Sequence, residues 1–180
     1  EDIPDISSLL VSGNKIWVGT YEGLYVIEKG EKARCLVDGP EFYRLFESSS
    51  GEVWAGCRTG GLYRIMPDEK VIWYSDSNAE PYHIESNQIR SFAEDRFGNI
   101  WFGTFLGLHK YNPYTDKFTV YRQDHLPGSL SHSSVFSVYI DTQATIWVGT
   151  YYGGANYFNP EKEIFAHYTD NPFRKECLNY

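Results

Sequence analysis

Ile16-Trp-Val-Gly-Thr20 is the first of four copies of one short phrase in this chain. The other copies are Val53-Trp-Ala-Gly-Cys57, Ile100-Trp-Phe-Gly-Thr104 and Ile146-Trp-Val-Gly-Thr150. Their tryptophans, which follow one another at intervals of 37, 47 and 46 residues, are Trp17, Trp54, Trp101 and Trp147. Self-similarity at such a period is typical of repeat architectures. The repetition therefore predicts four copies of one structural unit.

Each unit contains four short apolar runs separated by turn residues. In the third unit the runs are Ile89–Asp95, Asn99–Thr104, Leu108–Asn112 and Phe118–Arg122. Short strands joined by tight turns at even spacing predict antiparallel sheets. The second run of each unit is apolar on both alternating faces, as expected for a strand that is covered on both sides. Stacked sheets provide that environment, so we predict an all-β fold, a β-propeller with four consecutive four-stranded blades.

The predicted blades span about residues 5–38, 41–76, 88–123 and 134–169, and we name their strands A to D in chain order. Residues 170–180 would then form a connector to a further blade, so we expect the chain to be a segment of a longer propeller. The four tryptophans should be equally buried between blades. The glycines that follow them should lie where another backbone or ring comes close; they are Gly19, Gly56, Gly103 and Gly149.

Composition restricts the possible functions. The 180 residues carry a formal net charge of −8, which argues against nucleic-acid binding, because phosphates require clustered Lys and Arg. No apolar run approaches the roughly 18 residues of a membrane-spanning helix. The three cysteines, Cys35, Cys57 and Cys177, lack metal-ligand spacing. Cys57 takes the place that threonine holds in the other copies, so we expect it to pack as a small residue. No cofactor, metal, nucleic acid or membrane contact is predicted for this segment.

The third unit reads Ile89-x-x-Phe-x-Glu-Asp-x-x-Gly98-Asn-Ile-Trp-x-Gly-Thr-x-x-Gly107-Leu-x-x-Tyr-Asn-Pro113. This pattern resembles the two-component-regulator propeller repeat, which builds the periplasmic sensor region of hybrid two-component systems in Bacteroides-type bacteria. The resemblance covers all four units, although the first lacks the Glu-Asp pair and the second has Ser48-Ser-Ser50 there. It implies part of a seven-bladed periplasmic propeller. It also implies carbohydrate sensing, with downstream domains that include a histidine kinase controlling polysaccharide-utilisation genes.

The turns between strands B and C hold the first candidate site residues. In a propeller these B–C tips share one edge with the D–A loops, and ligands often bind at such variable loops. Aromatic faces stack on sugar C–H surfaces, and a guanidinium donates hydrogen bonds to hydroxyls or carboxylates. We therefore predict an oligosaccharide site that includes Tyr21, Arg58, Phe105 and Tyr151. The alternative is that these aromatic side chains only cover the core.

The two long D–A loops supply three further candidates, Tyr82, His83 and His132. The two histidines belong to separate loops and have no metal-ligand spacing, so solvated loop histidines are favoured over a metal site. The Glu94-Asp95 pair precedes the A–B turn, which indicates turn capping. An acid/base role for the pair is disfavoured, because adjacent residues on a strand point to opposite faces.

Three functional classes stay open at this stage. A ligand-sensing extracellular domain is favoured over a propeller scaffold for protein–protein interaction and over a lyase-like enzyme propeller. No GxSxG or HExxH motif supports an enzyme. We also expect this segment to self-associate, because its first and last blades would each leave an apolar sheet face without a neighbour.

Overall fold

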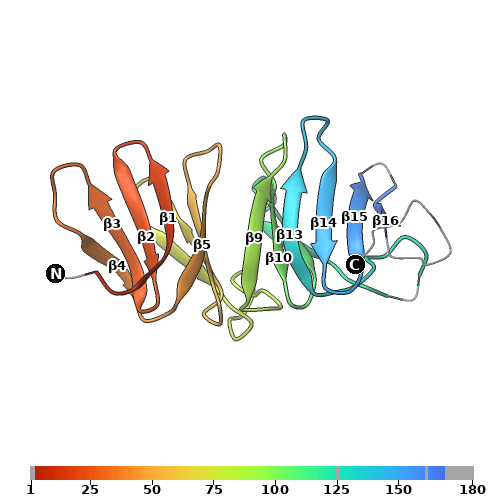
Figure 1. Ribbon diagram of the computed structural model, residues 1–180, viewed down its shortest axis with the longest axis horizontal. Coiled ribbons are helices and arrows are strands. Elements are labelled where there is room, and N and C mark those ends of the chain that lie inside the picture. The colour runs from red at the N-terminus through yellow and green to blue at the C-terminus, as the bar shows by residue number, and fades with distance from the viewer. Residues whose placement is uncertain (1–2, 125, 161, 169–180) are drawn as a thin grey trace. The chain divides into compact units, whose positions relative to one another are not determined.

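The computed structural model describes residues 3–124, 126–160 and 162–168, which are drawn as coloured ribbon in Figure 1. The connector predicted for 170–180, and with it Cys177, lies outside these residues. The chain divides into two compact units, Glu1–Arg90 and Ser91–Tyr180.

The first unit contains two four-stranded antiparallel sheets. Sheet one consists of β1 (Ile6–Ser12), β2 (Lys15–Thr20), β3 (Gly23–Glu28) and β4 (Arg34–Asp38). Sheet two consists of β5 (Phe42–Glu47), β6 (Val53–Cys57), β7 (Leu62–Ile65) and β8 (Val71–Tyr74). The strands pair in sequence order within each sheet, so each sheet is a meander with its first and last strands at the edges.

The second unit contains two sheets of the same topology, the first of which begins at the unit boundary. Sheet three consists of β9 (Ile89–Glu94), β10 (Ile100–Thr104), β11 (Leu108–Asn112) and β12 (Lys117–Tyr121). Sheet four consists of β13 (Val135–Ile140), β14 (Ile146–Thr150), β15 (Gly154–Asn159) and β16 (Ile164–Tyr168). The all-β prediction is confirmed, and the strand ends predicted for the third unit differ from these by at most one residue. Among the described residues, no helix is long and apolar enough to cross a membrane.

An apolar core lies between the two sheets of each unit. In the first unit it joins Trp17, Leu24 and Val26 of sheet one to Phe42, Val53, Ala55, Cys57 and Ile65 of sheet two. In the second unit Trp101 and Leu108 of sheet three pack with Val135, Val148, Phe158 and Phe165 of sheet four. Cys57 is fully buried, which raises the pKa of its thiol. The thiol thus packs as a small core group, as predicted.

The repeated tryptophans are not equally buried, so that prediction is wrong for one of them. Trp17, Trp54 and Trp101 are at most 4% exposed, whereas Trp147 is only partly buried. Trp17 and Trp101 each face the sheet that follows in their own unit. Trp147 instead stacks on Tyr168 of its own sheet, with 6.1 Å between ring centres. No further sheet follows β16 among the described residues, so nothing there covers the outer face of Trp147.

The glycine of the repeated phrase allows the sheets to approach. A Cβ atom on Gly19 would collide with the backbone oxygen of Phe42 in the next sheet. A Cβ on Gly103 would lie 2.6 Å from Cγ1 of Val135, again in the next sheet. At Gly19 and Gly103 the predicted close approach is thus made by strand A of the following blade, whereas a Cβ on Gly149 would meet Ser137 of its own sheet. A larger residue would force the two sheets apart.

Asp95 caps the A–B turn, as predicted, and has a second role that was not predicted. Its Oδ1 accepts hydrogen bonds from the backbone N–H groups of Phe97 and Asn99, at 2.9 and 3.0 Å. Its Oδ2 accepts one from Nε1 of Trp101, at 2.8 Å. Asp141 caps its own turn and binds Trp147 in the same way. One carboxylate therefore fixes both the turn and the orientation of the buried indole.

Candidate functional site at the loop edge

The B–C tips lie on the same edge of each sheet as the loops that lead into strand A. The backbone N–H of Arg58 donates to the carbonyl oxygen of Glu41 at 3.2 Å, and that of Tyr151 donates to Ser134 at 2.9 Å. Thr20 closes its tip from within: its Oγ1 donates to Gly23 O at 2.8 Å and accepts from the N–H of Glu22 at 3.2 Å. The tips are therefore rigid positions on which side chains can be displayed.

In the first unit this edge carries a cluster that we call the arginine–tyrosine cluster: Glu41, Tyr43, Arg44, Arg58 and Arg90. The guanidinium carbons of Arg44 and Arg58 lie 5.1 and 5.4 Å from the ring centre of Tyr43. Nε of Arg58 donates to Oε2 of Glu41 at 2.9 Å. Nε of Arg44 donates to the carbonyl oxygen of Arg90 at 2.8 Å. The start of strand A in sheet two thus gathers cations around one phenol ring.

The electrostatics of this cluster follow from its geometry. The hydrogen bond and charge of Glu41 raise the pKa of Arg58, with smaller contributions from Tyr43 and Tyr21. Burial raises the pKa of Tyr43, while the three arginines oppose that shift. Burial lowers the pKa of Arg90, although a guanidinium remains charged at any physiological pH. The Tyr43 phenol is therefore neutral and the arginines are cationic.

In the second unit the same edge carries an aromatic cluster: His132, Phe136, Tyr151 and Tyr152. Tyr151 stacks on Phe136 with 5.6 Å between ring centres, and it meets Tyr152 edge-on at 4.1 Å. The ring of His132 lies 6.3 Å from that of Tyr151, and its Nδ1 accepts from the N–H of Ser134 at 3.0 Å. A hydrogen bond with Tyr152 raises the pKa of Tyr151. These rings form an aromatic surface with phenol hydroxyls at its edge.

The loop before β9 holds the other two candidates. The backbone N–H of Ser75 donates to Tyr82 O at 3.1 Å, and the N–H of Ile84 donates to Ser75 O at 3.1 Å. Nδ1 of His83 lies 3.1 Å from the carbonyl oxygen of Asn78, so the imidazole is engaged by the loop itself. Tyr82 instead borders an open hollow beside β8 that Trp73 also lines.

The predicted aromatic residues at this edge are accessible. Tyr21, Phe105, Tyr151 and Tyr82 are between 46% and 55% exposed. The exposed parts can meet a ligand without any rearrangement of the core.

The structure brings some of the predicted residues together and adds others. His132 contacts Tyr151, whereas Tyr21 and Arg58 share an edge in the other unit. Tyr43, Arg44 and Phe136, which lie in the first strand of their sheets, were missed. A signal was available: Tyr43-Arg44 places a phenol and a cation at the start of an otherwise apolar strand. Among the residues that the structure describes, no group of three or more His, Cys, Asp or Glu could hold a metal ion.

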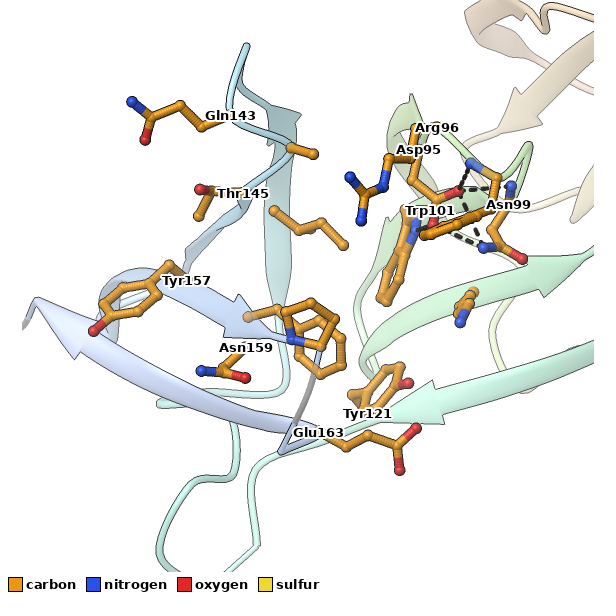
Figure 2. Close-up of a pocket in the computed structure, with 16 residues that line it drawn as sticks. Asp95, Arg96, Asn99, Trp101, Tyr121, Gln143, Thr145, Tyr157, Asn159 and Glu163 are labelled. Atoms are coloured by element: carbon orange, nitrogen blue, oxygen red, sulfur yellow. Dashed lines mark hydrogen bonds between the residues drawn. The ribbon is translucent and has the colours of Figure 1, made fainter.

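A pocket of about 450 Å³ lies at the opposite edge of the second unit, between sheets three and four (Figure 2). Figure 2 shows Asp95 hydrogen-bonded to Asn99 and Trp101 on one side, with Gln143, Thr145 and Asn159 on the other. Trp101 is 1% exposed, so its ring offers almost no surface to a ligand. The polar groups nearest to it already bind one another. This pocket is therefore a weaker candidate than the loop edge.

Comparison with known proteins connects this architecture to a family of repeats. Residues 83–105 match the family model described as two component regulator propeller. Histidine kinase P4 of Formosa agariphila is 31% identical to the chain in an alignment of 126 residues, and the match covers 62% of this chain and 9% of that protein. The predicted recognition of two-component-regulator propeller repeats is thus confirmed.

Solved structures agree with this finding. The extracellular domain of the putative one component system BT4673 from B. thetaiotaomicron is 26% identical, with a TM-score of 0.66 over 86% of this chain and 22% of that one. The extracellular domain of the putative hybrid two component system BT3049 from the same organism is 22% identical, with a TM-score of 0.69 over 97% of this chain and 23% of that one. The chain thus spans less than a quarter of either domain.

Proposed function

We propose that this chain, a propeller segment built of two-component-regulator repeats, is part of the extracytoplasmic sensor of a hybrid two-component system. It binds an oligosaccharide at the loop edge and does not alter it. The sensor region is periplasmic, and it signals through the rest of the propeller to a histidine kinase that controls polysaccharide-utilisation genes. The extracellular domains and the histidine kinase to which the chain is similar support this proposal.

The observation that carries the sugar proposal is the set of accessible rings at one repeated position. Tyr21, Phe105 and Tyr151 occupy equivalent B–C tips, each about half exposed, and Arg58 occupies the fourth. Aromatic faces supply apolar area at a low cost in side-chain entropy, and phenol and guanidinium groups add directional hydrogen bonds. This combination suits pyranose rings, which have apolar C–H surfaces and a polar rim.

A binding role is favoured over a catalytic one by the state of the polar groups at this edge. Glu41, the acid closest to the arginines, already accepts from Arg58. Nδ1 of His132 is occupied by a backbone N–H. A general acid or base needs a proton position within reach of the substrate. Oε2 of Glu41 is paired with Arg58 and its Oε1 is buried, so neither oxygen meets this need.

The test uses the complete sensor region that contains this segment. Its binding to an oligosaccharide library is measured on a glycan array and then by calorimetry, and the same sugars are checked for cleavage. Tyr151→Ala should weaken binding by about tenfold while thermal stability stays nearly unchanged, because the ring is largely a surface group. Tyr114→Ala is the matched control, since Tyr114 is 85% exposed in a turn at the opposite edge of the same unit.

Three outcomes contradict the proposal. The sensor region could bind no sugar. It could cleave what it binds, in which case the enzyme alternative is correct. Finally, Tyr151→Ala could lower stability without changing affinity, in which case Tyr151 covers the core and does not bind the ligand.

A further inference from the structure

The arginine–tyrosine cluster has a charge opposite to that of the chain that carries it. Arg44, Arg58 and Arg90 contribute three positive charges, and Glu41 contributes one negative charge. The whole chain has a formal net charge of −8. Cations held close together repel one another unless counter-charges are near. Glu41 supplies such a counter-charge to Arg58.

Arg44 is held in place without being neutralised. Its Nε donates to Arg90 O at 2.8 Å and its Nη1 donates to the carbonyl oxygen of Tyr43 at 3.0 Å, so both recorded acceptors are neutral. The guanidinium also lies over the Tyr43 ring. None of the ion pairs among the described residues includes Arg44. Its side chain is thus oriented while its charge remains available.

Arg58 is held in a complementary way. Glu41 binds its Nε, and Tyr43 lies beneath its guanidinium plane. Its side chain remains 62% exposed. The two Nη groups therefore form an open fork, the geometry that pairs in a bidentate manner with a carboxylate or a sulfate.

We infer that the arginine–tyrosine cluster is the subsite for an acidic sugar residue, whose carboxylate or sulfate ester is bound by Arg44 and Arg58. The inference rests on the proposed function, since it specifies the chemistry of the oligosaccharide bound at that edge. Tyr21, which is 55% exposed, offers the adjoining ring surface. A neutral glycan would leave the Arg44 guanidinium without a counter-charge, since Glu41 pairs with Arg58.

The experiment uses the complete sensor region and pairs of probes that differ only in charge. One pair is a galacturonate oligosaccharide and its methyl-esterified form. The other is a sulfated galactan oligosaccharide and its desulfated form. The two pairs distinguish a carboxylate ligand from a sulfate ligand, and a panel of naturally neutral oligosaccharides tests sugar binding itself.

We expect one charged probe to bind and its neutral partner to bind at least about tenfold more weakly, because a charge-assisted pair is lost. Arg44→Gln and Arg58→Gln should each weaken the charged probe by a similar factor and leave the neutral partner unaffected. Arg34→Gln is the matched control: Arg34 pairs with Glu69, a C–D turn residue of sheet two, and should not change affinity.

The outcomes separate this inference from the proposed function. If neutral oligosaccharides bind and the Gln variants bind them like the unaltered protein, the acidic subsite is refuted and sugar sensing stands. If no sugar binds in any arm, the proposed function itself fails, and this inference fails with it. If both Gln variants unfold, Arg58→Lys is used, which keeps the charge but removes the fork. Unchanged affinity in that folded variant would also refute the inference.

Discussion

Replacing Trp101 and Trp147 by alanine, one at a time, should have very different consequences, although both occupy the same repeat position. Trp101 is 1% exposed and packs against Phe158 and Tyr121 at ring distances of 5.4 and 5.7 Å. Truncation of a buried aromatic side chain costs about 3–5 kcal/mol. That is a large part of the roughly 5–15 kcal/mol by which a domain is stable. Trp101→Ala should therefore come close to unfolding its unit.

Trp147→Ala should cost less. Its ring contacts Tyr157 and Tyr168 of its own sheet but no following sheet among the described residues. With part of its surface already in water, we expect a loss of about 1–2 kcal/mol from the smaller apolar area that is buried. Each variant also loses one indole–carboxylate hydrogen bond, to Asp95 or Asp141, so that contribution cancels in the comparison.

The assay is urea denaturation of the 180-residue chain, followed by far-ultraviolet circular dichroism and by hydrogen exchange at β10 and β14. Hydrogen exchange is needed because a repeat protein can lose one part before another, so one global midpoint would be ambiguous. Equal destabilisation by the two variants would refute the argument. A larger effect of Trp147→Ala would show that the outer face of sheet four is covered in solution.

Four further predictions follow from particular contacts. The hydrogen bonds that Asp141 accepts from Trp147 and from backbone N–H groups lower its pKa in the folded state. Asp141 therefore stabilises the fold above its unfolded pKa of about 4, and this stabilisation is lost as the pH falls through the lower folded pKa. Asp141→Asn should make the free energy of unfolding fall less steeply at acid pH, and an unchanged fall would contradict this. Gly19→Ala should lower the free energy of unfolding by about 1–3 kcal/mol, because the new Cβ would meet the backbone oxygen of Phe42. An unchanged melting temperature would show that the sheets can separate at no cost. Glu69→Gln should lower the free energy of unfolding by less than about 1 kcal/mol, since its partners Lys15 and Arg34 are partly exposed. High salt should reduce the difference between the variant and the unaltered chain. A larger effect that salt does not change would contradict this. The chain should self-associate at high concentration, because Leu9, Val11 and Tyr139 are between 62% and 69% exposed on the first and fourth sheets; a concentration-independent monomer in sedimentation would contradict this.

The fold could be predicted from the sequence because its signal is repeated four times. Each copy combines a strand that is apolar on both faces with glycine-rich turns, so local pattern and packing point to the same answer. The turn residues also predicted where the strands end. The burial of Trp147 was predicted wrongly, because the sequence repeats the residue but not its surroundings. Burial depends on which sheet lies opposite, and the repeat alone does not contain that information.

The candidate site could be predicted only in part. Tyr21, Arg58, Phe105 and Tyr151 were identified because they share one repeat position, which a sequence displays directly. Tyr43 and Arg44 were missed because their role depends on contacts made across blades and through stacking. Arg44 reaches a carbonyl 46 residues further along the chain, and no spacing rule predicts such a contact. Positions can be aligned from a repeat, whereas the pairing of side chains requires the tertiary structure.

The threonine that closes three of the four B–C tips has a consequence for how this scaffold can change over time. Thr20 and Thr104 hold their turns through hydroxyl and backbone groups, and the side chains displayed at the tips take no part in that closure. Substitutions of the displayed side chains therefore leave the hydrogen bonds that close the turns in place. A lineage could exchange the exposed Tyr21 and keep the hydroxyl closure of its turn. New ligand preferences would then arise by single steps, each through an intermediate that still folds.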